Sequence, residues 1–226
     1  MIRFNNGKVT TSNKLLIFLS DFIRKLFGGD RLKRITREII NISKEISQKN
    51  KKKIIILDFG CGSMNISKKL NKYSFVKKVV GTDIFDFKLK SKKIEYIQSD
   101  IFFKLNDTKF DLVIAIDVLH HIGIDQAPKI LRKLSKVSNS IVIKDHFEYG
   151  FFSRHLLRFV DFYANYAYGV NIPKKYFDYK SWNKVVKKSA LNEIKLIQNF
   201  QQHNGLFNLI LNKKHHFISI LKNVEN

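Results

Sequence analysis

The stretch IIILDFGCGSMNIS, residues 54–67, decides the fold of this chain of 226 residues. It begins with β-branched and apolar residues, which are typical of a buried strand, and reaches an acid at Asp58. Gly60 and Gly62 follow, in a chain with only 10 glycines, and a polar segment that predicts a helix comes next. A turn of this kind presents bare backbone amides at a helix N-terminus, where a negatively charged group binds well. We therefore expect a ligand to lie against the turn.

Outward from this turn, short apolar runs alternate with polar helical stretches, which indicates βαβ units around a mostly parallel sheet. Strands are predicted at residues 53–58, 78–82, 94–98, 112–117, 140–144, 193–198 and 216–221. Helices are predicted at about residues 65–71, 126–137, 151–166 and 181–189. The fold class is therefore α/β, with helices on both faces of one sheet.

The first 50 residues predict two helices. Ser12 would cap the first, in which apolar residues recur at three- and four-residue spacing until Gly28 and Gly29 end it. Asp30 would cap the second, which carries a stripe of leucine and isoleucine. The expected division is a helical N-terminal extension or lid over residues 1–50 and an α/β domain over residues 51–226.

Composition limits the class of protein. The formal net charge is +23, mostly from lysine. Three explanations stay open for this charge, namely the bias of an AT-rich genome, an anionic membrane or lipid partner, and RNA or DNA. A single cysteine excludes a disulfide framework and a cysteine-based zinc site. No run is apolar enough for a transmembrane helix and no signal-peptide cleavage site is evident, which favours the cytoplasm.

Four successive predicted strands end in an acid, at Asp58, Asp83, Asp100 and Asp117. The carboxyl ends of parallel strands meet at one edge of a sheet, so these side chains would surround one crevice. An acid after the second strand can accept both hydroxyls of a ribose. A dinucleotide-binding turn would need a third glycine where Asn65 stands, so a different nucleoside is favoured.

Four segments, ILDFGCGS, VVGTDI, IQSDIF and FDLVIAIDVLHHI, together resemble the class I S-adenosylmethionine-dependent methyltransferases, and the resemblance spans roughly residues 31–222. It implies a Rossmann-like sheet of seven strands in the order 3-2-1-4-5-7-6, the last strand antiparallel, and S-adenosyl-L-methionine as the cofactor. The cofactor-binding residues that it implies are Asp58, Gly60, Gly62, Asp83, Ile84, Asp100, Ile101, Asp117 and Val118.

The resemblance also implies a role for each part of this set. The two glycines would back the methionine part of the cofactor, with Asp58 near its ammonium group, while Asp83 would hold the ribose. Asp100 and Ile101 would flank the adenine, and Asp117 with the following Val118 and Leu119 would border the sulfur. The family turn commonly reads G-x-G-x-G, but Met64 stands at the last position here. Its side chain would either crowd the methionine tail of the cofactor or point away from it.

Methyl transfer needs alignment of donor and acceptor and, for a hydroxyl acceptor, removal of a proton, for which histidine is suited. The candidate catalytic residues are His146, His121 and Asp145, which follow the fourth and fifth predicted strands. Asp145 should not orient His146 directly, because neighbouring side chains of a strand point to opposite faces. His120, which follows the fourth predicted strand, would face the substrate side of the crevice. The segment between the fifth and sixth strands forms the acceptor lid in this family, which implies substrate contacts for Arg158, Asp161, Asn165 and Tyr166. No metal site is predicted, because no clustered set of acids stands apart from those assigned to the cofactor.

The resulting prediction is a methyltransferase acting at oxygen or carbon of a small or lipid-linked acceptor. An amphipathic helix over residues 15–27 and the aromatic-rich lid favour an apolar or membrane-proximal substrate, with a peripheral membrane contact as an option. The alternatives are an RNA methyltransferase that uses the lysine-rich surface and a binding protein that keeps the fold without catalysis. Methylation of nucleic-acid bases is disfavoured, because DVLHH stands where an N-P-P-Y-type motif would be needed.

Overall fold

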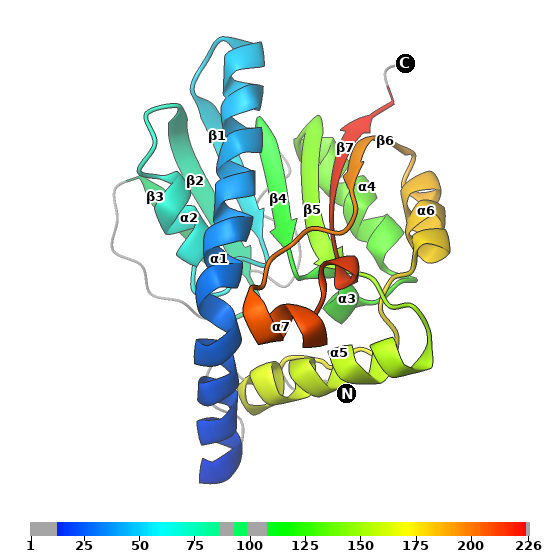
Figure 1. Cartoon of the computed structure of the whole chain (residues 1–226). Helices are drawn as coiled ribbons and strands as arrows, with labels where there is room; N and C mark the ends of the chain where they lie inside the picture. The colour runs from blue at the N-terminus through cyan, green and yellow to red at the C-terminus, as the bar shows by residue number, and fades with distance from the viewer. Residues whose placement is uncertain (1–12, 86–92, 99–107, 225–226) are drawn as a thin grey trace.

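One sheet of seven strands organises the chain (Figure 1). The structure is a computed structural model that describes residues 13–85, 93–98 and 108–224. The sheet has the order β3-β2-β1-β4-β5-β7-β6, as predicted. Its strands are β1 (Ile54–Phe59), β2 (Val76–Asp83), β3 (Ile94–Gln98), β4 (Leu112–Ile116), β5 (Ser140–His146), β6 (Leu191–Ile197) and β7 (His216–Asn223). The first five strands are parallel and β7 is antiparallel to both of its neighbours, which confirms the predicted fold class.

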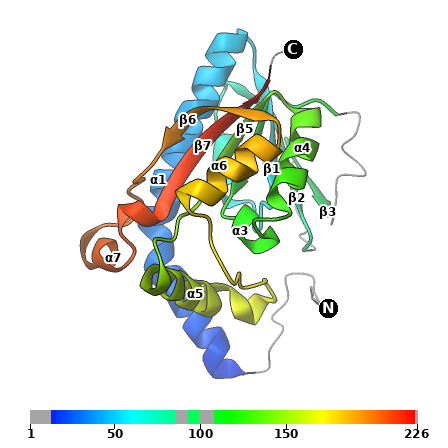
Figure 2. The same cartoon turned by 90° about the vertical axis from the view of Figure 1, so that its right-hand side faces the viewer.

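Helices cover both faces of the sheet and its carboxyl edge (Figure 2). The α-helices are α1 (Lys14–Asn50), α2 (Asn65–Leu70), α3 (Leu119–Ile122), α4 (Ala127–Val137), α5 (Phe151–Asn165), α6 (Tyr179–Lys188) and α7 (Gly205–Ile210). Two 3₁₀ turns, η1 (Tyr166–Tyr168) and η2 (Lys213–His215), follow α5 and precede β7. Helix α5 crosses beneath the carboxyl ends of the central strands, where it contacts α1. Among the described residues, no helix is long and apolar enough to cross a membrane.

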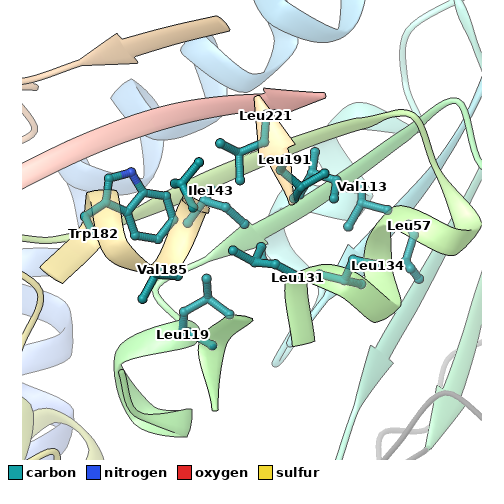
Figure 3. Packing of buried hydrophobic residues seen from close by; sticks show 14 of the residues in the cluster. Leu57, Val113, Leu119, Leu131, Leu134, Ile143, Trp182, Val185, Leu191 and Leu221 are labelled. Atoms are coloured by element: carbon teal, nitrogen blue, oxygen red, sulfur yellow. The ribbon is translucent and has the colours of Figure 1, made fainter. Parts of the chain in front are cut away.

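The alternation of side chains along each strand divides the core into two layers. On one face, α4 and α6 pack against residues such as Leu57, Val113 and Ile143 (Figure 3). On the other face, α1 and α2 pack against the alternate positions of the same strands, for example Ile56 and Ile114. Residues that are one apart in a strand point to opposite faces, so the apolar strands seen in the sequence are buried on both sides.

The prediction of two N-terminal helices is wrong, because α1 is one continuous helix of 37 residues. It begins after Asn13, whose side chain accepts hydrogen bonds from the backbone amides of Leu15 and Leu16. A glycine inside a helix costs only about 1 kcal/mol relative to alanine, and Gly28 and Gly29 do not interrupt the hydrogen-bonded backbone. Burial of the C-terminal half of α1 against the sheet favours the helix.

Helix α1 thus extends along the sheet to its carboxyl edge, where it contacts α5 and η1. Ile35, Ile39 and Ile42 are buried against the sheet, and Asp30, one turn before them, accepts a hydrogen bond from the side chain of Asn204 at 3.3 Å. The predicted boundary between an extension and the main domain, at residues 50 and 51, stays a prediction.

Candidate functional site

The glycine turn between β1 and α2 is shaped by two residues with positive φ. Gly60 has a φ of +69° and Gly62 of +51°, a region in which side chains are strained. A Cβ atom at Gly60 would lie 2.4 Å from Cγ2 of Val118, so the turn packs directly against the residue that precedes α3. A Cβ atom at Gly62 would meet nothing within 4 Å. The backbone at Gly62 is therefore open to a ligand, whereas Gly60 serves close packing.

Met64 also has a positive φ, of 58°, and precedes the first turn of α2. Its side chain is fully buried and lies over Gly81 of β2, where a Cβ atom would come within 2.3 Å of its Cε. Of the two arrangements that the sequence left open, the structure has the side chain in the core beside β2. Gly81 supplies the space that this bulky residue needs.

Two acids lie beside the turn without a basic partner among the described residues. Asp58 is buried and accepts a hydrogen bond of 2.5 Å from the hydroxyl of Ser67. Burial raises the pKa of Asp58 to about 6, although the hydrogen bond from Ser67 lowers it. Asp83 accepts hydrogen bonds from the backbone amides of Gly62, at 2.7 Å, and Phe85, at 3.3 Å, and burial raises its pKa as well.

The remaining residues of the predicted cofactor set fall into two groups. Ile84 directly follows β2, and its carbonyl accepts a hydrogen bond of 3.1 Å from the side chain of Gln98. Val118 packs on Gly60, as described. Asp100 and Ile101, predicted to flank the adenine, lie outside the described residues.

Asp117 follows β4 and is surrounded by basic side chains. Its carboxylate accepts hydrogen bonds from Arg31 of α1 and from Lys144 of β5, and Nε2 of His146 lies 3.1 Å from it. Lys144 is fully buried, so burial and the neighbouring charge of Arg31 hold the pKa of its amine well below the usual value. Sequence analysis did not predict Arg31 or Lys144 as site residues. Lys144 could have been predicted, because a lysine inside the apolar strand IVIKDH is unusual.

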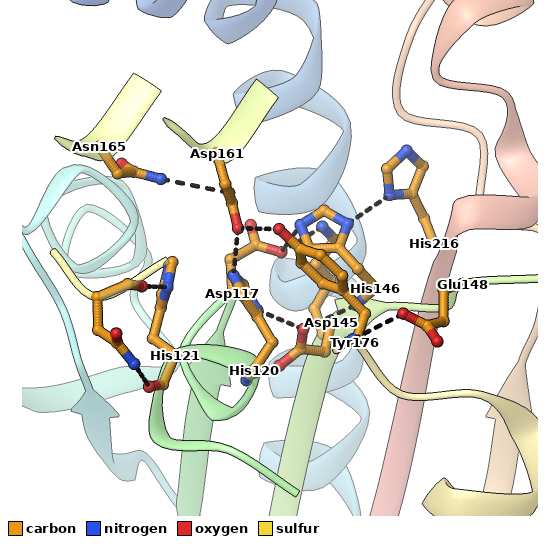
Figure 4. A network of polar contacts seen from close by, with 12 residues as sticks. Asp117, His120, His121, Asp145, His146, Glu148, Asp161, Asn165, Tyr176 and His216 are labelled. Carbon is orange, nitrogen blue, oxygen red and sulfur yellow. Dashed lines mark hydrogen bonds and ion pairs between the residues drawn. The ribbon is translucent and has the colours of Figure 1, made fainter. Parts of the chain in front are cut away.

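A second network lies next to Asp117 and contains six of the predicted site residues (Figure 4). Asp145 is fully buried, and its carboxylate lies 2.6 Å from Nδ1 of His120 and also accepts from the His120 backbone amide. Asp145 thus orients the ring of His120 and contacts only the backbone of His146, in line with the expectation from strand geometry. Nε2 of His120 lies 3.4 Å from Oδ2 of Asp161 in α5.

Further polar contacts hold the periphery of this network. The hydroxyl of Tyr176 donates to Asp161 at 2.5 Å, and the amide of Asn165 donates to it at 3.3 Å. His121 has Nδ1 at 2.7 Å from the carbonyl of Asn171. Sequence reasoning missed Tyr176, which reaches the network from the loop before α6, far along the chain from the two strands.

Burial and charge give the histidines of the network different pKa values. Burial acts to lower the pKa of His120, but the carboxylates of Asp145 and Asp161 raise it to about 9. Burial and the charge of His120 lower the pKa of His121 to about 4. Burial and the cation of Lys144 hold the pKa of His146 well below its ordinary range. At pH 7, His121 and His146 are therefore neutral and able to accept a proton.

Two predicted substrate residues lie at the margin of the network. Arg158 has a buried Nε without a hydrogen-bond partner, and its charge lowers the pKa of Tyr176, which burial raises. Tyr166 is exposed and stacks on Phe162 with ring centroids 4.6 Å apart. The structure thus brings His120, His121, Asp145, His146, Asp161 and Asn165 together and leaves Tyr166 outside.

Comparisons with known proteins agree with this architecture. Residues 57–140 match the family model described as a methyltransferase domain. No protein in the search of curated sequences matches the chain. Among solved structures, the methyltransferase domain of bacterial CtHen1 has a TM-score of 0.58 at 12% identity, covering 85% of this chain and 99% of that one.

Two further solved structures cover nearly the whole chain. Magnesium protoporphyrin IX methyltransferase from Synechocystis PCC 6803, with bound S-adenosylhomocysteine, has a TM-score of 0.56 at 13% identity, covering 92% of this chain and 99% of that one. An S-adenosylmethionine-dependent methyltransferase from Clostridium acetobutylicum ATCC 824 has a TM-score of 0.56 at 14% identity, covering 94% and 99%. At these identities the likeness shows the fold.

The matched segment and the order of the sheet agree with the Rossmann-like fold of the class I S-adenosylmethionine-dependent methyltransferases, as the sequence resemblance implied. The match to the methyltransferase domain covers residues 57–140.

Proposed function

We propose that the chain is a methyltransferase that uses S-adenosyl-L-methionine to methylate an oxygen or carbon atom of a small or lipid-linked acceptor. One observation carries the proposal: the glycine turn and the histidine network adjoin through a single short segment. Val118 packs against Gly60, and the residues that follow it, Leu119 to His121, lead directly into the network. A donor held by the turn would therefore present its reactive end to the side chains that can handle a proton.

The residues beside the turn fit the cofactor. When bound, S-adenosyl-L-methionine supplies an electrophilic methyl group on a sulfonium sulfur. Asp58 is a buried carboxylate without a basic partner among the described residues, which suits the ammonium group of the methionine part. Gly62 leaves open space beside its backbone, and the neighbouring Asp83 is suited to accept the ribose hydroxyls.

For a hydroxyl acceptor, the proton would pass to His146, which is neutral at pH 7. Asp117, with its carboxylate 3.1 Å from Nε2 of His146, would stabilise the imidazolium that forms. His121 is the second neutral imidazole, and Asp145 would act through His120 by fixing that ring. The predicted substrate contacts of Arg158, Asp161, Asn165 and Tyr166 stay part of the proposal, as residues of the covering helix α5 and the turn after it.

The surface next to α5 supports an apolar or lipid-linked acceptor. Large hydrophobic side chains are exposed on the N-terminal part of α1, for example Phe18, and on α5, where Phe152 is 86% exposed. The two helices contact each other at the carboxyl edge of the sheet (Figure 1). Exposed aromatic groups in a chain of net charge +23 favour peripheral contact with an anionic membrane. The Synechocystis neighbour is, by its name, a magnesium protoporphyrin IX methyltransferase, which is consistent with a small-molecule acceptor for this fold.

The test is methyl transfer from radiolabelled S-adenosylmethionine into separated cellular pools of lipids, small molecules and RNA. We expect label in the lipid or small-molecule pool, and loss of that label with Asp83→Ala but not with the exposed control Asp125→Ala. Label in RNA alone, with retention that falls steeply with salt, would favour the RNA methyltransferase. Failure to bind S-adenosylhomocysteine in calorimetry would point to a protein that keeps the fold without catalysis.

A further inference from the structure

Three potential metal ligands converge between α3 and α5. The donor atoms of His120, His121 and Asp161 all lie within 4.8 Å of one another. His120 is buried, whereas His121 and Asp161 are partly exposed, so the cluster can be reached from one side. All three are candidate site residues in the sequence analysis, but no metal site was predicted, because helix α5 brings Asp161 to the two histidines from a distant part of the chain.

Both imidazoles are fixed through the same ring nitrogen. Nδ1 of His120 lies 2.6 Å from the carboxylate of Asp145, and Nδ1 of His121 lies 2.7 Å from the carbonyl of Asn171. The carbonyl of His121 in turn accepts from the side chain of Asn171 at 3.0 Å. An Nδ1–H that donates to an oxygen leaves Nε2 with its lone pair, and this is how proteins commonly orient histidines that ligate metals.

The third ligand is oriented as well. Asp161 accepts hydrogen bonds from Tyr176 and from Asn165, which together fix both of its carboxylate oxygens. Ligating carboxylates are typically held by such outer hydrogen bonds. All three donor groups therefore have the supporting contacts that a metal site needs.

Nε2 of His120 is the most informative atom of the cluster. It is buried and has no hydrogen-bond partner, although Oδ2 of Asp161 lies 3.4 Å away. A buried polar atom without a partner is costly, and this separation is long for a hydrogen bond to a carboxylate. Two ligands about 2.0–2.1 Å from a tetrahedral metal ion stand about 3.3 Å apart, which matches the observed separation.

We propose that His120, His121 and Asp161 bind a divalent transition metal ion, with Zn²⁺ as the best fit. Two imidazoles and one carboxylate are typical of such sites, and three protein ligands leave a fourth position open. The metal ion would displace the proton from Nε2 of His120, because metal binding releases protons from its ligands. The carboxylates of Asp161 and Asp145 together carry the two negative charges that balance the ion. The open position would take an oxygen of the methyl acceptor, and this role, unlike metal binding itself, rests on the proposed function.

The test is a calorimetric titration of the full chain, stripped with a chelator, with ZnCl₂ alone in the absence of cofactor and acceptor. We expect one Zn²⁺ per chain, and an affinity lower by about 100-fold or more in both His121→Ala and Asp161→Asn. The control is His155→Gln, which removes an exposed histidine from the same helix as Asp161 and should leave the affinity unchanged. Circular dichroism and a thermal melt establish that each variant is folded. Asp161→Asn keeps the size of the side chain, so it tests the charge even where His121→Ala unfolds the site.

Two results would overturn the inference: absence of stoichiometric Zn²⁺ binding, or binding that His121→Ala and Asp161→Asn leave intact. Substitution with Co²⁺ gives an independent readout, since a site with imidazole and carboxylate ligands should give a visible absorption band that is absent in Asp161→Asn. Binding of S-adenosylhomocysteine is measured separately on the same preparations. A protein that binds this nucleoside but not Zn²⁺ contradicts only the metal site, and the reverse result contradicts only the proposed function.

Discussion

The two ends of the candidate site, at the glycine turn and beyond β4, differ in how completely their charges are paired. Beside the glycine turn, Asp58 and Asp83 have only hydrogen bonds from a hydroxyl and from backbone amides, and burial raises the pKa of both. Beyond β4, in contrast, Asp117 and Asp145 each contact a lysine, arginine or histidine. The first end is left for a charged ligand to complete. The end beyond β4 already has its charges paired within the protein. Such preorganisation is what a site that transfers protons or binds metal ions requires.

The strongest probe of the preorganised end is His146→Ala. If His146 accepts the acceptor's proton, its loss should lower turnover by about 10²–10⁴-fold, since general base catalysis contributes on this scale. Binding of S-adenosylhomocysteine should stay nearly unchanged, because the turn and its acids are intact. Methyl transfer into the labelled cellular pool and calorimetry measure the two quantities.

His155→Ala, which changes an exposed histidine of α5, is the matched control for this substitution and should leave turnover unchanged. Turnover at the wild-type level in His146→Ala would remove the residue from the reaction and leave His121 as the remaining neutral imidazole at this end. If His146→Ala lost binding of S-adenosylhomocysteine as well as turnover, the glycine turn and the histidine network would not be independent of each other.

The pairing of charges at this end can be broken with Lys144→Met. The substitution leaves the carboxylate of Asp117 with one of its two cations in a mostly buried place, and breaking such a pair costs about 3–5 kcal/mol. Because Arg31 remains, we expect a loss near about 3 kcal/mol in the free energy of unfolding, measured with urea.

Two further variants sharpen this prediction. Lys187→Met removes an exposed lysine of α6 and should change stability by less than about 0.5 kcal/mol. Adding Asp117→Asn to Lys144→Met removes the stranded charge and should restore part of the loss. A Lys144→Met protein as stable as the wild type would show that the buried pair contributes nothing.

The same contrast explains what the sequence could predict. The turn, Asp58 and Asp83 lie within a few residues of two strands, so local spacing was enough to place them at one sheet edge. Asp161 was expected only from the family resemblance and Tyr176 was missed, because both reach the network from a helix and a loop whose positions depend on tertiary packing, which local patterns do not encode. The helix break expected at Gly28 and Gly29 failed for a related reason, because packing of α1 on the sheet outweighs a propensity cost of about 1 kcal/mol per glycine.

At the incomplete end, Asp83→Ala tests the assignment of the ribose. The variant removes the charged acceptor of two ligand hydroxyls, which should weaken binding of S-adenosylhomocysteine by roughly 1–3 kcal/mol. Calorimetry measures the change, and Asp125→Ala, an exposed acid before α4, serves as the control. An unchanged dissociation constant in Asp83→Ala would contradict the assignment.

The smallest and most specific effect is expected from pH. Asp58 has a pKa raised to about 6, so between pH 7 and pH 5 it becomes protonated in the free protein. An ammonium group beside it favours the ionised form, so affinity for S-adenosylhomocysteine should fall as the pH falls through 6, by about tenfold between pH 7 and pH 5. The stability of the free protein should respond in the opposite sense, because a pKa above the unfolded value favours the folded state at low pH.

In Asp58→Asn, affinity should be weaker at pH 7 and should lose this part of its pH dependence. A wild-type affinity that stays flat from pH 7 to pH 5 would show that Asp58 does not meet the ammonium group, and the unpaired charge at this end would then need a different ligand.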